Sequence, residues 1–106
     1  MKYEDLDDQL DLICDAIISI KDRKTCKNFL KDICTINELY SLVQRLQVAY
    51  MLNNNKTYQE IAHETHASTA TISRVNRCLN YGEKGYKAVL NNLPDDAGKK
   101  NWLSYI

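Results

Sequence analysis

Apolar residues recur every three or four positions along most of this chain, which is the spacing that places them on one face of an α-helix. In residues 4–20 the recurrence follows a heptad rhythm, at Leu6, Leu10, Ile13, Ile17 and Ile20. The opposite face of this segment is acidic. Because an amphipathic helix buries its apolar face, residues 4–20 predict a helix that packs against another helix, in the same chain or in a partner chain.

The same spacing predicts two further helices, over about residues 23–34 and 36–53. The first has an inward face formed by Phe29, Leu30, Ile33 and Cys34. The apolar residues of the second are Leu39, Leu42, Val43, Leu46, Ala49 and Tyr50. The asparagine-rich segment Asn53–Lys56 then ends this helix, because asparagine favours turns over helix interiors.

Cap residues divide the rest of the chain into three short helices. The sequence Thr-Tyr-Gln-Glu at 57–60 is a capping box that begins a helix over residues 58–64. Ser68 or Thr69 caps the next helix, over about 69–80, and Gly82 ends it. The last helix covers about residues 83–92, with an apolar side formed by Tyr86, Val89, Leu90 and Leu93. Beyond the turn-rich "PDDAGKK" segment, the apolar residues expected to dock back are Trp102, Leu103 and Ile106.

No strand pattern and no internal repeat is present, so we predict a single all-α domain, residues 1–106, of about six helices. Two of these helices and the turn between them have the dimensions of a helix-turn-helix, at about residues 57–81. Its inward positions are Ile61, Ala62, Ala67, Ile72, Val75 and Leu79. His66 stands in the turn, where glycine is common because the chain adopts positive φ; histidine tolerates this conformation at some cost.

The outward side of the second short helix is polar, with Thr69, Thr71, Ser73, Arg74, Asn76 and Arg77. Short hydroxyl side chains at a helix N-terminus can approach base edges and phosphates, and arginines further along reach phosphates or guanine. This side therefore predicts a recognition helix for double-stranded DNA. A solvated helix pair in a bundle carries the same kind of surface and stays open as an alternative.

The charge distribution permits a nucleic-acid partner without requiring one. The chain has 106 residues and a formal net charge of zero, so no basic field covers the whole molecule. Residues 1–22 contain seven acids and two lysines, a net charge of −5, and the remainder carries +5. The C-terminal part is thus the part suited to an anionic partner. With no signal peptide and no apolar run of about 18 residues, we expect a soluble cytoplasmic protein without a membrane segment.

The sequence gives little support for catalysis or metal binding. The cysteines are widely spaced and form no C-x-x-C pair, which favours reduced thiols over a zinc or redox site: Cys14, Cys26, Cys34 and Cys78. His63 and His66 are three residues apart across an expected helix break, unlike the i, i+4 pair of a zinc H-E-x-x-H motif. We therefore expect no enzyme activity, no cofactor and no metal site.

The segments "TINELYSLVQRLQVAYMLNNN" and "TYQEIAHETHASTATISRVNRCLNYG" resemble the Trp repressor family, and within it the YerC/YecD-type branch. The resemblance is best over residues 35–93 and most specific at Ala70–Arg74 and in the helix that holds Arg45. It implies an all-α homodimer in which the N-terminal helices of two chains interlock. Such a dimer places two recognition helices in successive major grooves, about 34 Å apart.

By position, the family's DNA-reading surface falls on Gln59, Ala62, Ser68, Thr69, Ala70, Thr71 and Ser73. We add the outward-facing Arg74 and Arg77 to the expected DNA-binding residues. The family has basic residues where Gln59 and Ala62 stand, so the operator sequence is not implied and weaker phosphate affinity is expected.

The family's ligand site is matched only in part. In the Trp repressor, tryptophan lies between two arginines and beside a threonine, which align with Arg45, Arg74 and Thr35. A serine that helps hold the ligand's amino group aligns with Cys78, a poorer hydrogen-bond partner. Val75 replaces a glycine and fills space that the indole needs, and such overpacking costs about 1–3 kcal/mol. We therefore expect no response to tryptophan and leave the effector open.

These features predict a homodimeric, sequence-specific DNA-binding transcriptional regulator, most simply a repressor. An alternative of another class is a helical dimer that binds a protein partner through the same surface, with weak or no DNA binding. The zero net charge and the two missing basic residues favour that alternative.

Overall fold

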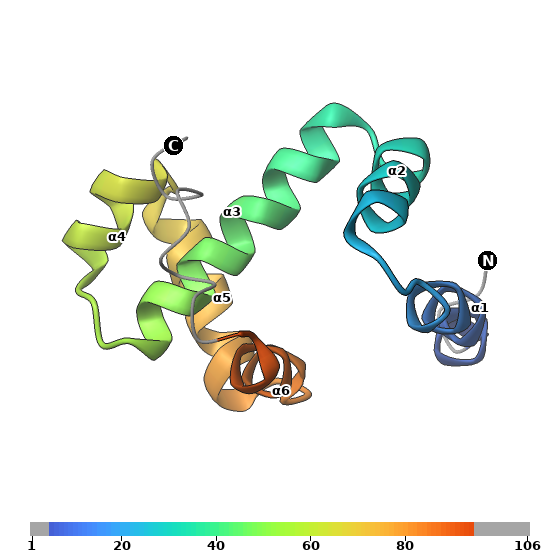
Figure 1. The fold of residues 1–106 in the computed structure, drawn as a ribbon. Coiled ribbons are helices and arrows are strands. Elements are labelled where there is room, and N and C mark those ends of the chain that lie inside the picture. Colours follow the sequence, from blue (N-terminus) through green and yellow to red (C-terminus); the bar gives the residue numbers. More distant parts are fainter. Residues whose placement is uncertain (1–4, 95–106) are drawn as a thin grey trace. The chain divides into compact units, whose positions relative to one another are not determined.

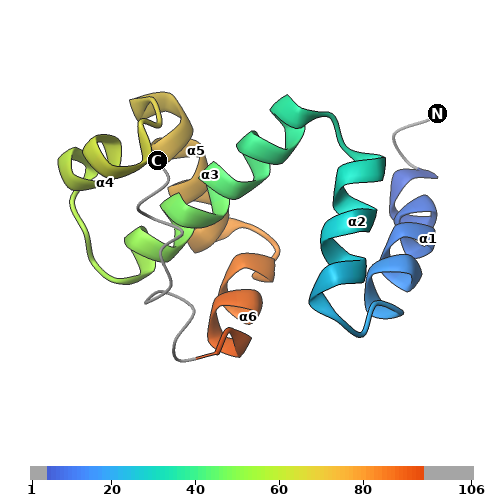
Figure 2. The same ribbon diagram turned by 45° about the horizontal axis from the view of Figure 1, so that its top comes forward.

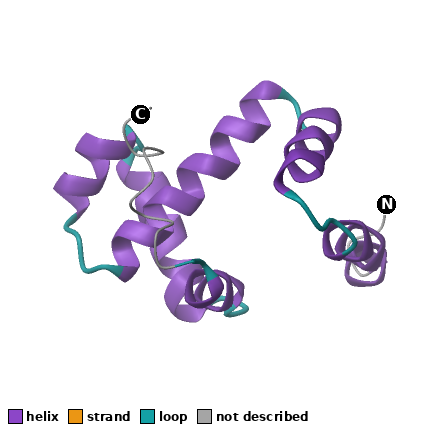
Figure 3. Cartoon of the chain, viewed as in Figure 1, coloured by secondary structure: helices purple, strands orange, loops and turns teal. Residues whose placement is uncertain are grey.

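The computed structural model describes residues 5–94, which form six helices and no strand (Figures 1 and 3). The helices are α1 (Leu6–Ile18), α2 (Arg23–Ile33), α3 (Ile36–Asn53), α4 (Tyr58–Thr65), α5 (Thr69–Tyr81) and α6 (Gly85–Asn92). The predicted all-α class is confirmed, while the expected docking of Trp102, Leu103 and Ile106 lies outside the described residues. Within residues 5–94, no helix has the length and apolar character needed to cross a membrane.

The chain divides into two compact units, residues 1–39 and residues 40–106, and α3 begins in the first and continues into the second. The N-terminal unit contains α1 and α2. Neither helix has a buried side chain. Ile17 and Ile33, two members of the predicted apolar faces, are 52% and 51% exposed. The apolar faces of α1 and α2 thus exist, but the N-terminal unit of one chain does not bury them.

Carboxylate caps begin α2 and α3. Asp22 accepts a hydrogen bond from the Thr25 N–H (2.9 Å), and Glu38 accepts one from the Thr35 N–H (2.8 Å). The Thr35 hydroxyl accepts from the Glu38 N–H in return (3.1 Å), which completes a reciprocal cap. These backbone bonds, helped by the threonine side chains, lower the pKa of both carboxyl groups.

The C-terminal unit has its own apolar core. Helix α3 contributes one side, and α4, α5 and the turn between them contribute the other: Val48, Ala49, Met51, Ile61, Ala67, Ile72 and Val75. Tyr86 and Leu90 of α6 pack against this cluster. Figures 1 and 2 show α3 and α5 crossing within this unit, with α4 leading into α5 and α6 following it. The core therefore fixes α5 by its buried side.

Helix α3 buries only part of the apolar stripe that its spacing predicted: Ala49 is buried, and Tyr50 packs against the core. Leu42 and Val43 are 44% and 51% exposed, whereas Val48 and Met51 are buried. The helix carries two adjacent apolar stripes, and the one at positions 48, 49 and 51 faces α4 and α5. The prediction that Leu42 and Val43 face the interior is wrong for a single chain.

Gly82 ends α5, but it does not adopt the left-handed conformation that is usual for a glycine after a helix. Its φ is −87°, and it is Lys84 that adopts the left-handed conformation, with a φ of 67°. A Cβ atom at position 82 would instead collide with the Cys78 carbonyl group. Glycine is therefore required here by the close approach of the backbone to the last turn of α5.

Candidate nucleic-acid interface

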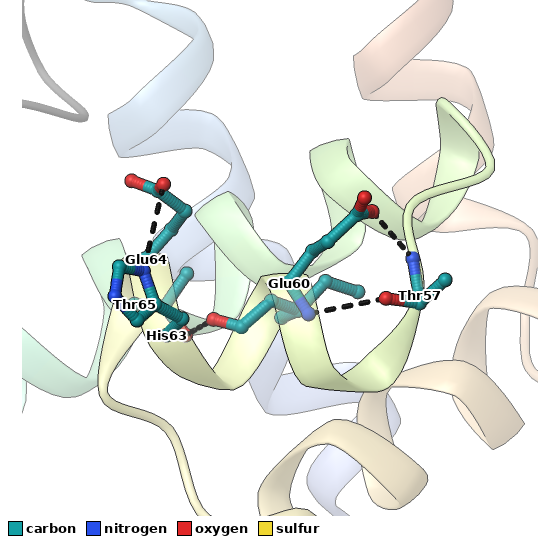
Figure 4. Close-up of polar contacts among 6 residues, drawn as sticks. Thr57, Glu60, His63, Glu64 and Thr65 are labelled. Carbon is teal, nitrogen blue, oxygen red and sulfur yellow. Dashed lines mark hydrogen bonds and ion pairs between the residues drawn. The ribbon is translucent and has the colours of Figure 1, made fainter.

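The capping box expected at the start of α4 is present (Figure 4). The Thr57 hydroxyl accepts from the Glu60 N–H (3.1 Å), and the Glu60 carboxylate accepts from the Thr57 N–H (2.9 Å). Gln59 lies exposed on the same turn. The box fixes where α4 begins, and so the position of Gln59 at its outer surface.

The turn after α4 has the predicted left-handed residue. His66 has φ 60° and ψ 16°, and its N–H donates to the Ala62 carbonyl (2.9 Å). Ala67, the next residue, is buried against the core at 5% exposure. The turn at residues 66–68 therefore joins α4 and α5 as a helix-turn-helix.

Thr65 is buried at 2% exposure, and its side-chain hydroxyl has hydrogen-bond partners. Its hydroxyl donates to the Ile61 carbonyl (2.8 Å; Figure 4) and accepts from the Ala67 N–H (3.1 Å). Its carbonyl oxygen accepts a hydrogen bond from the Gln44 side-chain amide (3.1 Å). Thr65 thus ties the end of α4 to the turn and to α3.

Ser68 is the cap of α5. Its hydroxyl oxygen accepts from the Thr71 N–H (3.1 Å), and its proton is donated to the Thr71 Oγ1 (3.1 Å). The Ser68 proton is thus used within the cap. The hydroxyl proton of Thr71 is left for an outside acceptor, because a hydroxyl that accepts one bond can still donate another.

Helix α5 has one buried and one exposed side, as predicted. Ile72, Val75 and Leu79 are buried, at 0%, 1% and 6% exposure. On the opposite side, Ser73 is half-buried and four residues are exposed: Thr69, Ala70, Arg74 and Arg77. The helix contains two arginines and no acid. The exposed side of α5 is therefore a cationic surface with short side chains at its N-terminal end.

A groove of about 330 Å³ lies between α3 and α5, which we call the arginine groove; it is lined by Ser41, Gln44, Arg45, Thr71, Arg74 and Val75. The Arg45 Nε donates to the Ser41 carbonyl (3.3 Å). Within residues 5–94, no carboxylate pairs with either arginine. Two guanidinium groups that have no carboxylate partner among residues 5–94, together with hydroxyl groups, make the groove suitable for an anion.

The predicted ligand residues are brought together only in part. Arg45 and Arg74 share the arginine groove, and buried Val75 forms part of its wall. Cys78 is exposed on α5 and does not line the groove. Thr35 belongs to the N-terminal unit, where it caps α3. Gln44 was missed at this site because its bond to Thr65 spans 21 residues of sequence.

His63 of α4 lies beside a carboxylate, not within a group of possible metal ligands among residues 5–94. His63 Nδ1 lies 3.8 Å from Glu64 Oε1 at the surface of α4 (Figure 4). In the described part of the chain, no cluster of three histidine, cysteine or acidic side chains could hold a metal ion.

Comparison with known proteins gives a consistent result. The family model described as Trp repressor protein matches residues 8–94. The uncharacterized protein YerC of Bacillus subtilis (strain 168) is 52% identical over 87 residues, which cover 82% of this chain and 84% of that protein.

Two crystal structures are similar in both sequence and fold. One is of a proposed Trp repressor from Staphylococcus aureus, with a TM-score of 0.77 and 47% identity, covering 86% of this chain and 92% of that one. The other is of a TrpR like protein from Eubacterium eligens ATCC 27750, with a TM-score of 0.75 and 51% identity, covering 79% of this chain and 87% of that one. With the family model matching most of the chain, this protein belongs to the Trp repressor family.

Proposed function

We propose that this protein is a homodimeric, sequence-specific DNA-binding transcriptional repressor that does not respond to tryptophan. Membership of a family of DNA-binding regulators, which are not enzymes, supports the general class. The observation that carries the proposal is α5, which is held by its buried side and exposes a cationic side next to a helix-turn-helix turn.

The proposed contacts follow from where each side chain lies on α5. Thr69, Ala70 and Ser73 are short and lie near the N-terminal end, where the backbone can approach base edges. Arg77 lies one turn further, within reach of a phosphate or a guanine edge. We assign these four residues to the reading face, together with Gln59 from α4.

Three polar residues beside the reading face have proposed roles in phosphate binding. Thr71 has a free hydroxyl proton near the N-terminus of α5, where N–H groups and the helix dipole favour an anion. Arg74 adds charge at the edge of the arginine groove. Ser68 acts through Thr71, whose position its cap fixes.

A second copy of the chain is the proposed partner of the exposed apolar faces. Ile17 of α1 and Val43 of α3 are each more than half exposed in one chain. Exposed apolar surface of this kind on amphipathic helices is typical of an interface between protein chains. Two recognition helices then read half-sites about 34 Å apart on DNA.

The test is selection of sites from a pool of random duplexes, followed by polarisation titration of the selected site. We expect specific binding that weakens as salt rises, with Arg77→Ala and Thr71→Ala each reducing affinity by about tenfold, or about 1.4 kcal/mol. Lys87→Ala is the matched control, since Lys87 is an exposed cation on α6 outside the reading face. No enriched site at low salt would overturn the proposal and favour a dimer that binds a protein partner.

Calorimetry with L-tryptophan tests the missing effector response. Val75 is 1% exposed and forms part of the groove wall, so a β-branched side chain occupies space beside both arginines. We expect no heat of binding at micromolar concentrations, and micromolar affinity would contradict the proposal. Val75→Gly is the matched variant, because it restores the residue found in the family's tryptophan site.

A further inference from the structure

The end of α4 is held by a side chain from outside the helix-turn-helix. Thr65 is the last residue of α4, so no following helical turn supplies an N–H group for its carbonyl oxygen. Thr65 is 2% exposed, which leaves little access for water. The Gln44 amide of α3 donates a 3.1 Å hydrogen bond to that oxygen. One long-range bond thus satisfies a carbonyl that the helix itself leaves without a partner.

Gln44 also borders a groove that the second helix of the pair helps to form. It lines the arginine groove together with Thr71 and Arg74 of α5. The core around it joins α3 to α4 and α5 through apolar contacts, which are not directional. A hydrogen bond, in contrast, restricts both distance and angle. The Gln44 amide is therefore placed to set how the end of α4 lies on α3.

The internal bonds of the turn do not perform this task. The Thr65 hydroxyl accepts from the Ala67 N–H, and the His66 N–H donates to the Ala62 carbonyl. These bonds fix the shape of the turn because both of their ends belong to it. They do not by themselves fix the orientation of the turn on α3, to which the core and the Gln44 amide both contribute.

We infer that Gln44 is a positioning residue of the helix-turn-helix: its amide fixes the end of α4 on α3 and thereby sets the orientation in which α5 is presented. The consequence for DNA rests on the proposed function of α5 as a recognition helix. Gln44 itself makes no DNA contact in this mechanism, so its loss reduces discrimination between sites more than general affinity for DNA.

The test compares Gln44→Met with Gln44→Lys in the full chain. Methionine keeps the length of the side chain without a donor, and lysine keeps a terminal donor. Both are titrated against the selected site and a scrambled duplex at one salt concentration. We expect Gln44→Met to lower the ratio of the two affinities about tenfold, and Gln44→Lys to retain it within about threefold. The ratio is the readout because the charge that lysine adds raises both affinities.

Asn54 supplies a matched control. Its amide donates a 2.7 Å hydrogen bond to the Tyr50 carbonyl at the end of α3, outside the turn. Asn54→Ala should leave the affinity ratio unchanged. A spectroscopic readout accompanies the titration: in Gln44→Met the carbonyl carbon resonance of Thr65 should shift, and in Asn54→Ala it should not.

An unchanged ratio and an unchanged Thr65 resonance in Gln44→Met would overturn the inference. A wild-type protein that selects no DNA sequence would overturn the proposed function instead. In that event the Thr65 resonance alone decides whether Gln44 holds the turn. The two failures are therefore distinguishable.

Discussion

The two units of the chain form helices equally well but bury very different amounts of apolar surface. In residues 40–94, Val48, Ile61 and Ile72 are each 0% exposed. In residues 5–39 no side chain is buried, and Leu12 and Ile18 are 79% and 78% exposed. Local helix signals do not explain this difference, since α2 and α4 both begin at good caps. The difference lies in what faces each helix.

This contrast separates two kinds of stability. The C-terminal unit has a core of its own, so its fold can be maintained by contacts within one chain. The helices of the N-terminal unit are amphipathic without a covered face, and isolated helices of this length are marginal in water. The N-terminal unit is therefore expected to gain most of its stability from a partner surface.

The largest expected effect is in the core of the C-terminal unit. Ile72→Ala removes buried methyl groups and leaves a cavity, which should cost about 2–5 kcal/mol of unfolding free energy. Leu12→Ala in α1 is the matched truncation, and its cost should stay below about 1 kcal/mol because Leu12 is 79% exposed. Urea unfolding monitored by circular dichroism measures both. Equal costs would remove the distinction between the two units.

The second effect concerns the exposed face of α1. Ile17→Asp places a charge on the apolar face, so the dissociation constant of the dimer should rise about 100-fold, or about 2.7 kcal/mol. Asp15→Asn, on the acidic side of α1, is the control and should leave it unchanged. Sedimentation at micromolar concentration provides the measurement. A stable wild-type monomer would contradict the proposed interface.

The smallest effect is a pH dependence confined to the N-terminal unit. Hydrogen bonds from Thr25 and Thr35 lower the pKa of Asp22 and Glu38 in the folded protein. Because their pKa is lowered on folding, these carboxylates stabilise the fold at pH values above their unfolded pKa of about 4. This stabilisation is lost as the pH falls through the pKa of the folded state. Acid should therefore loosen α2 and the start of α3 before the C-terminal core.

Site-resolved amide exchange between about pH 6 and 2.5 tests this order of events. Asp22→Asn combined with Glu38→Gln should abolish the pH dependence of exchange protection in α2 and at the start of α3, because neither side-chain amide titrates. Loss of protection in the core at a higher pH than in α2 would show that other carboxyl groups dominate.

Much of the helix-turn-helix follows from residues that are close in sequence. The Thr57–Glu60 box, the Ser68 cap and the left-handed His66 each depend on residues no more than four positions apart. The buried stripe of α5 follows from helical periodicity alone. These features were predicted correctly because their physical causes are local.

The features that were not predicted depend on which surfaces meet. Spacing predicted one apolar stripe on α3, which includes Val43, and it did not indicate that the same chain covers Val48 and leaves Val43 half exposed. The bond from Gln44 to Thr65 joins positions 21 residues apart, which no local pattern indicates. The family resemblance predicted that Arg45 and Arg74 line one site. It also suggested Cys78 as a ligand residue, but Cys78 lies outside the groove.

Gly82 has a consequence for how freely this protein tolerates mutation. A Cβ atom at position 82 would meet the main-chain carbonyl of Cys78, which no substitution elsewhere can make smaller. In an exhaustive substitution library, position 82 should therefore accept few residues other than glycine, even though it is exposed. A Cβ atom added at Gly85 would meet no atom within 4 Å, so the same library should tolerate many side chains there. Two glycines three positions apart would thus give opposite mutational profiles, one set by sterics and the other nearly free.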